Sequence, residues 1–217
     1  MQEHHLPVTR SARYFTLGDP GPALREVWVV LHGYGQLAAR FLRHFEPLDD
    51  GTRLIAAPEG LSRFYLTESP AERRVGASWM TREDRLAEID DYLRYLDAVY
   101  ADVLRPFDRS RVKITALGFS QGTATVCRWA ALGFARVDRL IVWGGEVPPD
   151  LDLAREPAAG RLPALSLSLV YGDRDELFTP KVIAATEARL REHGIPYALV
   201  PFAGGHEIDA ATLRRLG

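Results

Sequence analysis

The sequence predicts an α/β fold, with a mostly parallel sheet covered by helices on both faces. Segments of almost continuous apolar and β-branched residues alternate with segments of helical spacing along nearly the whole chain. A serine flanked by glycines stands between one of these strands and the following helix. The 217 residues show no internal repeat or low-complexity linker, so we expect a single domain over residues 1–217.

The first part of the chain alternates strand, helix and strand. Residues 26–31 are β-branched and aromatic, which predicts a buried strand, and we expect a short strand over residues 12–17 before it. Apolar side chains recur at helical spacing in residues 37–48. Residues 52–57 then form a second apolar run, which Pro58 ends.

The middle of the chain contains the longest predicted helix. Apolar residues recur at intervals of three and four over residues 83–104, and Pro106 follows its end. Residues 112–117 form the next strand, and the helix formers of residues 123–132 come soon after it.

The last part repeats the same alternation. Residues 138–143 and 164–171 are apolar strands that each end at glycine. Residues 179–193 have a proline in the first turn and a glycine after the end, which predicts a helix. A final strand over residues 196–202 and a short helix over residues 208–216 complete the pattern.

Two long connections, residues 58–81 and 144–163, leave the carboxyl ends of strands. Open α/β sheets bind their ligands at that edge, so we expect these connections to form the walls of a pocket. Neither has room for a sizeable cap domain.

Composition excludes several functional classes. A net charge of −2 without basic blocks gives no reason to expect nucleic acid or an anionic membrane as partner, and no apolar stretch is long enough for stable membrane insertion. The N-terminus lacks the pattern of a signal peptide, and the single cysteine, Cys127, excludes an intramolecular disulfide. We therefore expect a cytoplasmic protein. No metal or nucleotide motif is present, so no metal or other cofactor is expected.

The glycine-flanked serine has the form of a nucleophile elbow, Gly118-Phe119-Ser120-Gln121-Gly122. A sharp turn between strand and helix leaves no room for side chains two positions before and after its apex, and glycine at 118 and 122 removes the Cβ atoms that would clash. Ser120 is then held in a strained conformation with its hydroxyl exposed at a helix N-terminus. We expect Ser120 to act as a nucleophile.

A serine nucleophile needs a base, and histidine is the best suited side chain, with an unperturbed pKa of about 6.5. Of the six histidines, His206 alone follows both the elbow and the end of a strand, in the loop Ala203-Gly204-Gly205-His206-Glu207. The sequence therefore favours His206 as the base.

The base in turn needs a carboxylate that fixes its tautomer. The loop Tyr171-Gly172-Asp173-Arg174-Asp175-Glu176 leaves the preceding strand with three carboxylates, any of which could instead cap a turn or helix. Asp175 is favoured over Asp173 because it lies further out and can reach the histidine, but the residues alone leave both open.

Two backbone N–H groups must face the charge that develops on the substrate oxygen. The N–H of Gln121, directly after the nucleophile, is the first candidate. The second is the N–H of Tyr34, in the turn His32-Gly33-Tyr34-Gly35 after an early strand. This turn is by itself equally compatible with a purely structural role.

These motifs resemble the phospholipase/carboxylesterase family of α/β-hydrolases, which includes the acyl-protein thioesterases. The resemblance covers nearly the whole length and is carried by the following segments: Leu31-His32-Gly33-Tyr34-Gly35, Ala57-Pro58, Ser78-Trp79, the elbow, Gly145 with Pro148, Tyr171-Gly172-Asp173-Arg174-Asp175 and Gly205-His206-Glu207-Ile208. It implies an α/β-hydrolase fold, with Ser120 as nucleophile, Asp175 as acid, His206 as base, and Tyr34 and Gln121 as oxyanion donors.

Three positions depart from the family pattern. Gln36 stands where Asp is frequent, Met80-Thr81 follow Trp79 where an aromatic residue and Asp are usual, and Gly144-Gly145 replace Ser-Gly. All three border the expected pocket, so they bear on substrate choice and leave the catalytic residues intact.

Together these features predict a serine carboxylesterase that acts on short- to medium-chain acyl esters of small molecules through an acyl-enzyme. Aromatic side chains at strand ends, Trp79, Phe119 and Phe178 together with Tyr34, are candidates for the substrate pocket. A thioesterase or lysophospholipase with the same triad is the alternative. A hydrolase-like binding protein without catalysis is disfavoured because serine, acid and histidine are all present in order. The oligomeric state is left open between monomer and homodimer.

Overall fold

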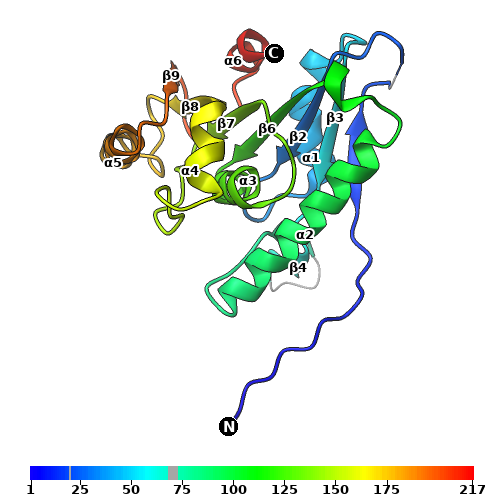
Figure 1. Ribbon diagram of the computed structural model, residues 1–217, viewed down its shortest axis with the longest axis vertical. Coiled ribbons are helices and arrows are strands. Elements are labelled where there is room, and N and C mark those ends of the chain that lie inside the picture. Colours follow the sequence, from blue (N-terminus) through cyan, green and yellow to red (C-terminus); the bar gives the residue numbers. More distant parts are fainter. Residues whose placement is uncertain (20, 68–72) are drawn as a thin grey trace.

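The computed structural model describes residues 1–19, 21–67 and 73–217. Its main sheet has seven strands in the order β1-β3-β2-β6-β7-β8-β9, in which β1 runs antiparallel to β3 and every other neighbouring pair is parallel (Figure 1). The strands are β1 (Tyr14–Leu17), β2 (Glu26–Leu31), β3 (Arg53–Pro58), β6 (Lys113–Phe119), β7 (Arg139–Trp143), β8 (Ser166–Gly172) and β9 (Tyr197–Phe202). The predicted mostly parallel sheet is thus confirmed, with each strand within a few residues of its expected place.

Helices cover both faces of this sheet, as predicted (Figure 1). The helices are α1 (Ala38–Phe41), α2 (Arg85–Leu104), α3 (Gln121–Leu132), α4 (Ala158–Arg161), α5 (Pro180–Glu192) and α6 (Ala210–Leu216), with the 3-10 helices η1 (Leu42–Leu48), η3 (Arg109–Arg111) and η4 (Leu162–Ala164). Helices α2 to α5 contribute to one hydrophobic cluster, and α1, η1 and α6 contribute to the other.

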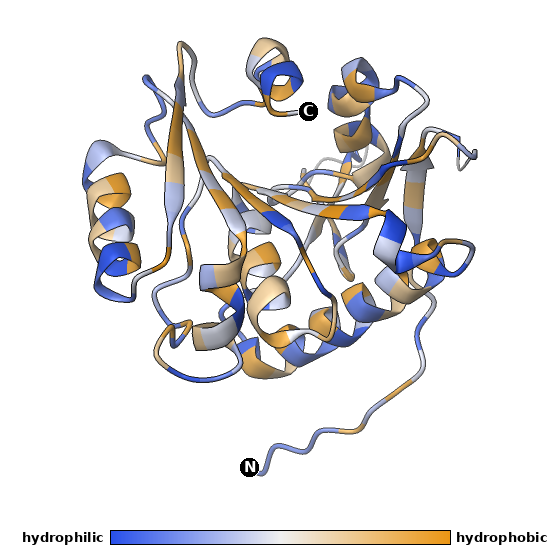
Figure 2. Ribbon diagram, turned by 45° about the horizontal axis from the view of Figure 1, so that its top comes forward, coloured by the Kyte–Doolittle hydropathy of each residue, from blue (hydrophilic) through white to orange (hydrophobic). Residues whose placement is uncertain are grey.

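Alternate residues of one strand belong to opposite clusters, because successive side chains of a strand point to opposite faces. In β2, Val27, Val29 and Leu31 lie in the first cluster, whereas Trp28 and Val30 lie in the second. Burial on both faces explains why the strands are almost continuously apolar. The helices carry both orange and blue segments in Figure 2, since only one side of each is packed against the sheet.

Two predicted segments differ from the structure. The expected helix over residues 37–48 divides into a single α-helical turn, α1, and the 3-10 helix η1, which contains Pro47. Proline has no N–H to donate and disfavours the helical conformation of the residue before it, so a regular α-helix does not continue there. The expected loop over residues 58–81 contains a separate two-stranded hairpin, β4 (Ser62–Tyr65) and β5 (Val75–Ser78), while residues 68–72 lie outside the described part.

The fold brings the carboxyl ends of β2, β6, β7, β8 and β9 to one edge of the sheet, since these strands run parallel. The loops that carry Tyr34, Asp175 and His206, and the turn that carries Ser120, follow these ends. The long connection after β7 contains α4 and η4 and was predicted as a loop. Among the described residues, no helix is both long and apolar enough to cross a membrane.

Candidate active site

Ser120 occupies the turn between β6 and α3, with φ 53° and ψ −118°. A positive φ is uncommon for a residue with a side chain and marks local backbone strain. The flanking glycines make the turn possible: a Cβ on Gly118 would lie 2.2 Å from the carbonyl oxygen of Gly122, and one on Gly122 would lie 2.4 Å from that of Leu31. The steric reason for glycine at both positions, inferred from the sequence, therefore holds in the structure.

His206 follows β9 and is paired with Asp175, which follows β8. The Nδ1 atom of His206 lies 2.8 Å from Oδ2 of Asp175. Since an ionised carboxylate only accepts, Nδ1 carries the hydrogen and Nε2 is the free, basic nitrogen. Nε2 is buried and has no hydrogen-bond partner within the described part of the chain. His206 and Ser120 border the same cavity.

Asp175 is held at both carboxylate oxygens. Its Oδ1 accepts hydrogen bonds from the N–H groups of Leu177 and Phe178, each at 2.9 Å, while Oδ2 faces the imidazole. Burial raises the pKa of Asp175, but the hydrogen bonds from His206 and the two N–H groups outweigh it, so that pKa lies below its usual range. The carboxyl is therefore ionised at neutral pH.

Asp173, the other candidate for the acid, has a different role. Its Oδ1 accepts the N–H of Gly204 at 3.0 Å, and its own N–H donates to the carbonyl of Phe202. Asp173 thus joins the loop after β8 to the loop after β9. This contact positions the segment that carries His206.

Of the two predicted oxyanion donors, Gln121 directly follows the nucleophile and Tyr34 follows Gly33 in the turn after β2. The N–H groups of Gln121 and Tyr34 have no hydrogen-bond partner in residues 1–19, 21–67 and 73–217. Gly33 lies against the nucleophile, since a Cβ there would be 3.1 Å from the Cβ of Ser120. The Oε1 of Gln36 accepts the Gly33 N–H at 2.8 Å, which shapes the turn before Tyr34.

His32 supports the same turn from inside the protein. The N–H of Gly60 donates to its Nε2 at 2.9 Å, so Nδ1 carries the hydrogen and donates to the Gly33 carbonyl at 2.8 Å. Burial lowers the pKa of His32, which keeps the ring neutral. Trp79 packs against the ring, with 5.0 Å between centroids, and donates its indole N–H to the His32 carbonyl at 2.8 Å.

The side chain of Gln121 fixes the start of α3 against the end of β5. Its amide donates to the Ser78 hydroxyl at 3.0 Å and to the Met80 carbonyl at 2.8 Å, and its oxygen accepts the Trp79 N–H at 3.1 Å. Gln121, which was predicted to donate its backbone N–H to the oxyanion, therefore also anchors the helix through its side chain.

A cavity of about 370 Å³ opens beside Ser120 and His206. Its walls come from α3, from the connection after β7 and from the segment that leads into α5. The connection after β7 was one of the two predicted pocket walls. The polar side chains around the cavity, besides Ser120 and His206, are Thr123, Arg128, Glu146 and Asp150.

The predicted aromatic pocket residues occupy different places. Phe178 lies in the cavity wall, with 3 % of its surface exposed. Trp79 belongs to the first hydrophobic cluster and Phe119 to the second, where Phe119 packs against the His206 ring at 4.9 Å between centroids. Tyr34 is 60 % exposed and its ring packs against that of Phe64 in the β4–β5 hairpin.

Three residues near the site were not predicted from the sequence. Gln36 was noted only as a departure from a family pattern, and the structure places its side chain on the Gly33 N–H. Arg128 and Asp150 form an ion pair at the cavity wall. Arg128 lies eight residues after Ser120, two helical turns along α3, and that spacing was the available signal.

The described residues contain one group of side chains spaced to hold a metal ion, Glu3, His5 and Asp84. All three are exposed, and none of them lines the cavity beside Ser120. This group is therefore not part of the candidate active site.

Comparison with solved structures decides the fold. Acyl-protein thioesterase 2 from Zea mays matches with a TM-score of 0.72 and 19% identity, over 95% of this chain and 96% of that one. A carboxylesterase from Mesorhizobium loti matches with a TM-score of 0.71 and 20% identity, over 94% and 93% of the two chains. The chain has the α/β-hydrolase fold.

The carboxylesterase of Bacillus cereus matches with a TM-score of 0.69 and 15% identity, over 94% of this chain and 91% of that one. No protein-family model and no curated protein matches the sequence. The resemblance drawn from the motifs is therefore confirmed at the level of the α/β-hydrolase fold.

Proposed function

We propose that this α/β-hydrolase is a serine carboxylesterase that cleaves short- to medium-chain acyl esters of small molecules. One observation carries the proposal: His206 Nδ1 lies 2.8 Å from Asp175 Oδ2, and the imidazole borders the same cavity as Ser120. Nucleophile, base and acid follow the ends of three parallel strands. The esterase and thioesterase names of the structural neighbours support the same reaction class.

In the proposed reaction, Ser120 Oγ attacks the ester carbonyl while His206 Nε2 takes the hydroxyl proton. The tetrahedral intermediate collapses, and the imidazolium gives that proton to the leaving alcohol. A water molecule then attacks the acyl-enzyme with the same imidazole as base, which releases the carboxylic acid and restores Ser120. Asp175 keeps the imidazole in the required tautomer and stabilises its charged form.

The N–H groups of Tyr34 and Gln121 would hold the negative oxygen of both tetrahedral intermediates. In comparable sites one such donor contributes roughly 3–4 kcal/mol to transition-state stabilisation. The N-terminus of α3 adds the positive end of its dipole at the same point. This arrangement needs no cofactor for ester hydrolysis.

Ser120→Ala tests the nucleophile. We expect the variant to retain its circular dichroism spectrum and to lose turnover of 4-nitrophenyl butyrate by at least about 10³-fold, as in other serine hydrolases. A fluorophosphonate probe should label the parent protein at Ser120 and leave the variant unlabelled. Retained turnover in the folded variant, or an unlabelled parent protein, would refute the proposal.

Thioester hydrolysis by the same triad is the second candidate, and a lysophospholipase activity belongs with it. One observation favours it: the neighbour from Zea mays is named an acyl-protein thioesterase. The ratio of kcat/KM for an oxygen ester and a thioester of the same acyl group distinguishes the two. A ratio above one supports the carboxylesterase, and a ratio well below one supports the thioesterase.

A further inference from the structure

The cavity beside Ser120 has an arginine in its wall. Arg128 projects from α3, and its side chain is 4 % exposed. It lies two helical turns after Ser120, which corresponds to about 12 Å along the helix axis. Both residues line the same cavity.

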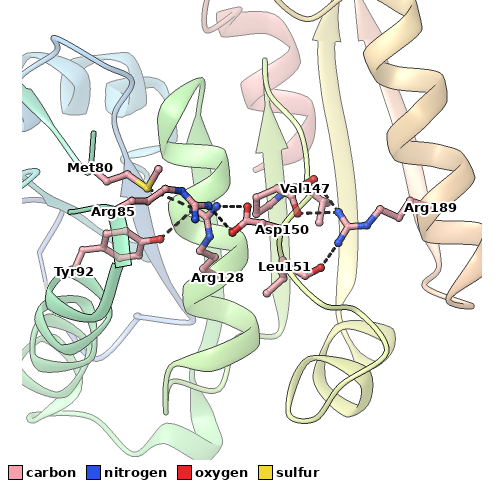
Figure 3. Close-up of polar contacts among 9 residues, drawn as sticks. Met80, Arg85, Tyr92, Arg128, Val147, Asp150, Leu151 and Arg189 are labelled. Carbon is pink, nitrogen blue, oxygen red and sulfur yellow. Dashed lines mark hydrogen bonds and ion pairs between the residues drawn. The ribbon is translucent and has the colours of Figure 1, made fainter. Parts of the chain in front are cut away.

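Arg128 forms a cluster with Arg85 and Asp150, in which the positive charges outnumber the negative ones (Figure 3). Its Nη2 lies 2.7 Å from Asp150 Oδ1, and Nη2 of Arg85 lies 2.5 Å from Asp150 Oδ2. Among the ion pairs of the described residues, the guanidinium groups of Arg128 and Arg85 thus share one carboxylate, that of Asp150. The cluster carries a net charge of +1.

The other contacts of Arg128 are uncharged. Its Nη1 donates to the Tyr92 hydroxyl at 3.3 Å and approaches the Met80 sulfur at 3.9 Å. Burial raises the pKa of Tyr92, so the phenol is neutral. Of the five N–H donors of a guanidinium, Nε–H and one hydrogen on Nη2 have no protein acceptor within the described part of the chain.

The other carboxyl in the cavity wall does not balance this charge. Glu146 has no ion pair with any described arginine, and the opposing charge that acts on it is Arg189. Burial raises the pKa of Glu146, and Arg189 only partly offsets that effect. Arg189 itself donates to the carbonyls of Val147, Pro148 and Leu151, which holds the connection after β7 in place (Figure 3).

A structural role accounts for the ion pair itself, which joins the connection after β7 to α3. It does not account for the second guanidinium or for the position of the pair in the wall of a cavity that contains the nucleophile. Arg128 is paired with Asp150, but it shares that carboxylate with Arg85, so one positive charge of the cluster has no ion-pair partner among the described residues. A second anion in the cavity would balance that charge.

We propose that the ester half that enters this cavity carries a carboxylate, which Arg128 binds while Asp150 and Arg85 orient its guanidinium. The inference rests on the proposed ester hydrolysis and names its substrate class. A cavity of about 370 Å³ accommodates a short chain with a polar end. Esters of dicarboxylic acids with one free acid group, and acyl esters of hydroxy acids, have this chemistry.

Two matched substrate pairs test the proposal on the full chain. In the first pair, phenyl hydrogen adipate carries a carboxylate in its acyl half, and methyl phenyl adipate is its neutral counterpart. In the second pair, 4-(butanoyloxy)benzoate carries the carboxylate in its alcohol half, and its methyl ester is the neutral counterpart. For each pair we take the ratio of kcat/KM for the anionic substrate to kcat/KM for the neutral one. We expect Arg128→Gln to lower this ratio by about 10- to 100-fold in one pair, because this is the range for a lost charge-assisted hydrogen bond.

Arg94→Gln is the matched control, because it removes the same charge from an exposed side chain of α2 that pairs with Asp91. It should leave both ratios unchanged. A structural effect of Arg128→Gln would lower the rates of both members of a pair together, and an unchanged ratio in both pairs overturns the proposal. As a second variant, Arg128→Lys retains the charge and should retain more of the anionic preference than Arg128→Gln.

Labelling of Ser120 by a neutral fluorophosphonate, done on the same preparations, separates the two proposals. If the serine is labelled but neither pair shows a preference that depends on Arg128, the carboxylate inference is wrong and the esterase proposal stands. If the serine is not labelled, the esterase proposal itself fails. Adipate should in addition slow the labelling of the parent protein more than that of Arg128→Gln.

Discussion

At the scale of single residues, the candidate triad depends on how Asp175 uses its two oxygens. Oδ1 accepts two backbone N–H groups and Oδ2 accepts the imidazole N–H, so the carboxylate has a fixed orientation. The net lowering of its pKa means that it stays ionised well below neutral pH. Protonation of Asp175 therefore does not account for a loss of activity between pH 8 and pH 5.

Asp175→Asn tests this orientation. The backbone N–H groups require an oxygen, so the amide nitrogen would face His206 Nδ1 and move the ring hydrogen to Nε2, where it blocks the base. We expect kcat for an acyl ester to fall by roughly 10⁴-fold, as for the same exchange in a serine protease. Activity of the parent protein should rise with pH from 5 to 8.

The check is a pH profile of kcat/KM for the parent protein and the variant, with circular dichroism as control for folding. A pH-independent rate in the parent protein would contradict the role of His206 as base. An Asp175→Asn variant with nearly full activity would contradict the role of Asp175.

Residue types and chain order predicted Ser120 and His206 from the sequence, because the elbow marks the serine and His206 alone follows both the elbow and the end of a strand. Reach favoured Asp175 over Asp173 without excluding the latter, and the family resemblance implied Asp175; the structure places Asp175 against the imidazole. Arg128 and Gln36 were not predicted for their contacts. Their roles arise from packing between segments far apart in the chain.

At the scale of elements, the turn between β6 and α3 is built against β2. The clearance at Gly122 is set by a backbone carbonyl, that of Leu31, which cannot rotate away as a side chain can. The strand bounds were predictable because burial on both faces produces continuous apolar runs. The β4–β5 hairpin was not predictable, since its strands are only four residues long and β4 is only partly buried.

Gly122→Ala should therefore be harmful although alanine favours helices. The new Cβ would lie 2.4 Å from the Leu31 carbonyl oxygen, so α3 or β2 must shift. We expect a loss of about 1–3 kcal/mol in the free energy of unfolding, typical of overpacking, together with reduced ester hydrolysis. Urea unfolding measures the first effect, and Gly21→Ala is the control because nothing lies within 4 Å of its Cβ position. Equal stability of the two variants would contradict the steric argument.

At the scale of the whole molecule, the sheet separates two hydrophobic clusters and carries the candidate site at one edge. Helix α3 connects these parts, since it begins directly after Ser120, has Arg128 in the cavity wall and has Cys127 within the first cluster. The position of the pocket was predictable from the parallel topology. Its charged lining was not, because it combines α3 with the connection after β7.

Cys127 reports on the integrity of this arrangement, because it is the single cysteine and has no exposed surface. Burial raises the pKa of its thiol to about 12, so the reactive thiolate is suppressed as well as inaccessible. We expect iodoacetamide at pH 8 to label the native protein at least about 10³-fold more slowly than the unfolded chain, in line with ordinary domain stability. In a urea series, the labelling should increase together with the loss of the circular dichroism signal. Rapid labelling with an intact spectrum would instead mean that α3 opens locally, and the helix that carries the nucleophile would then not be the rigid support that the esterase proposal requires.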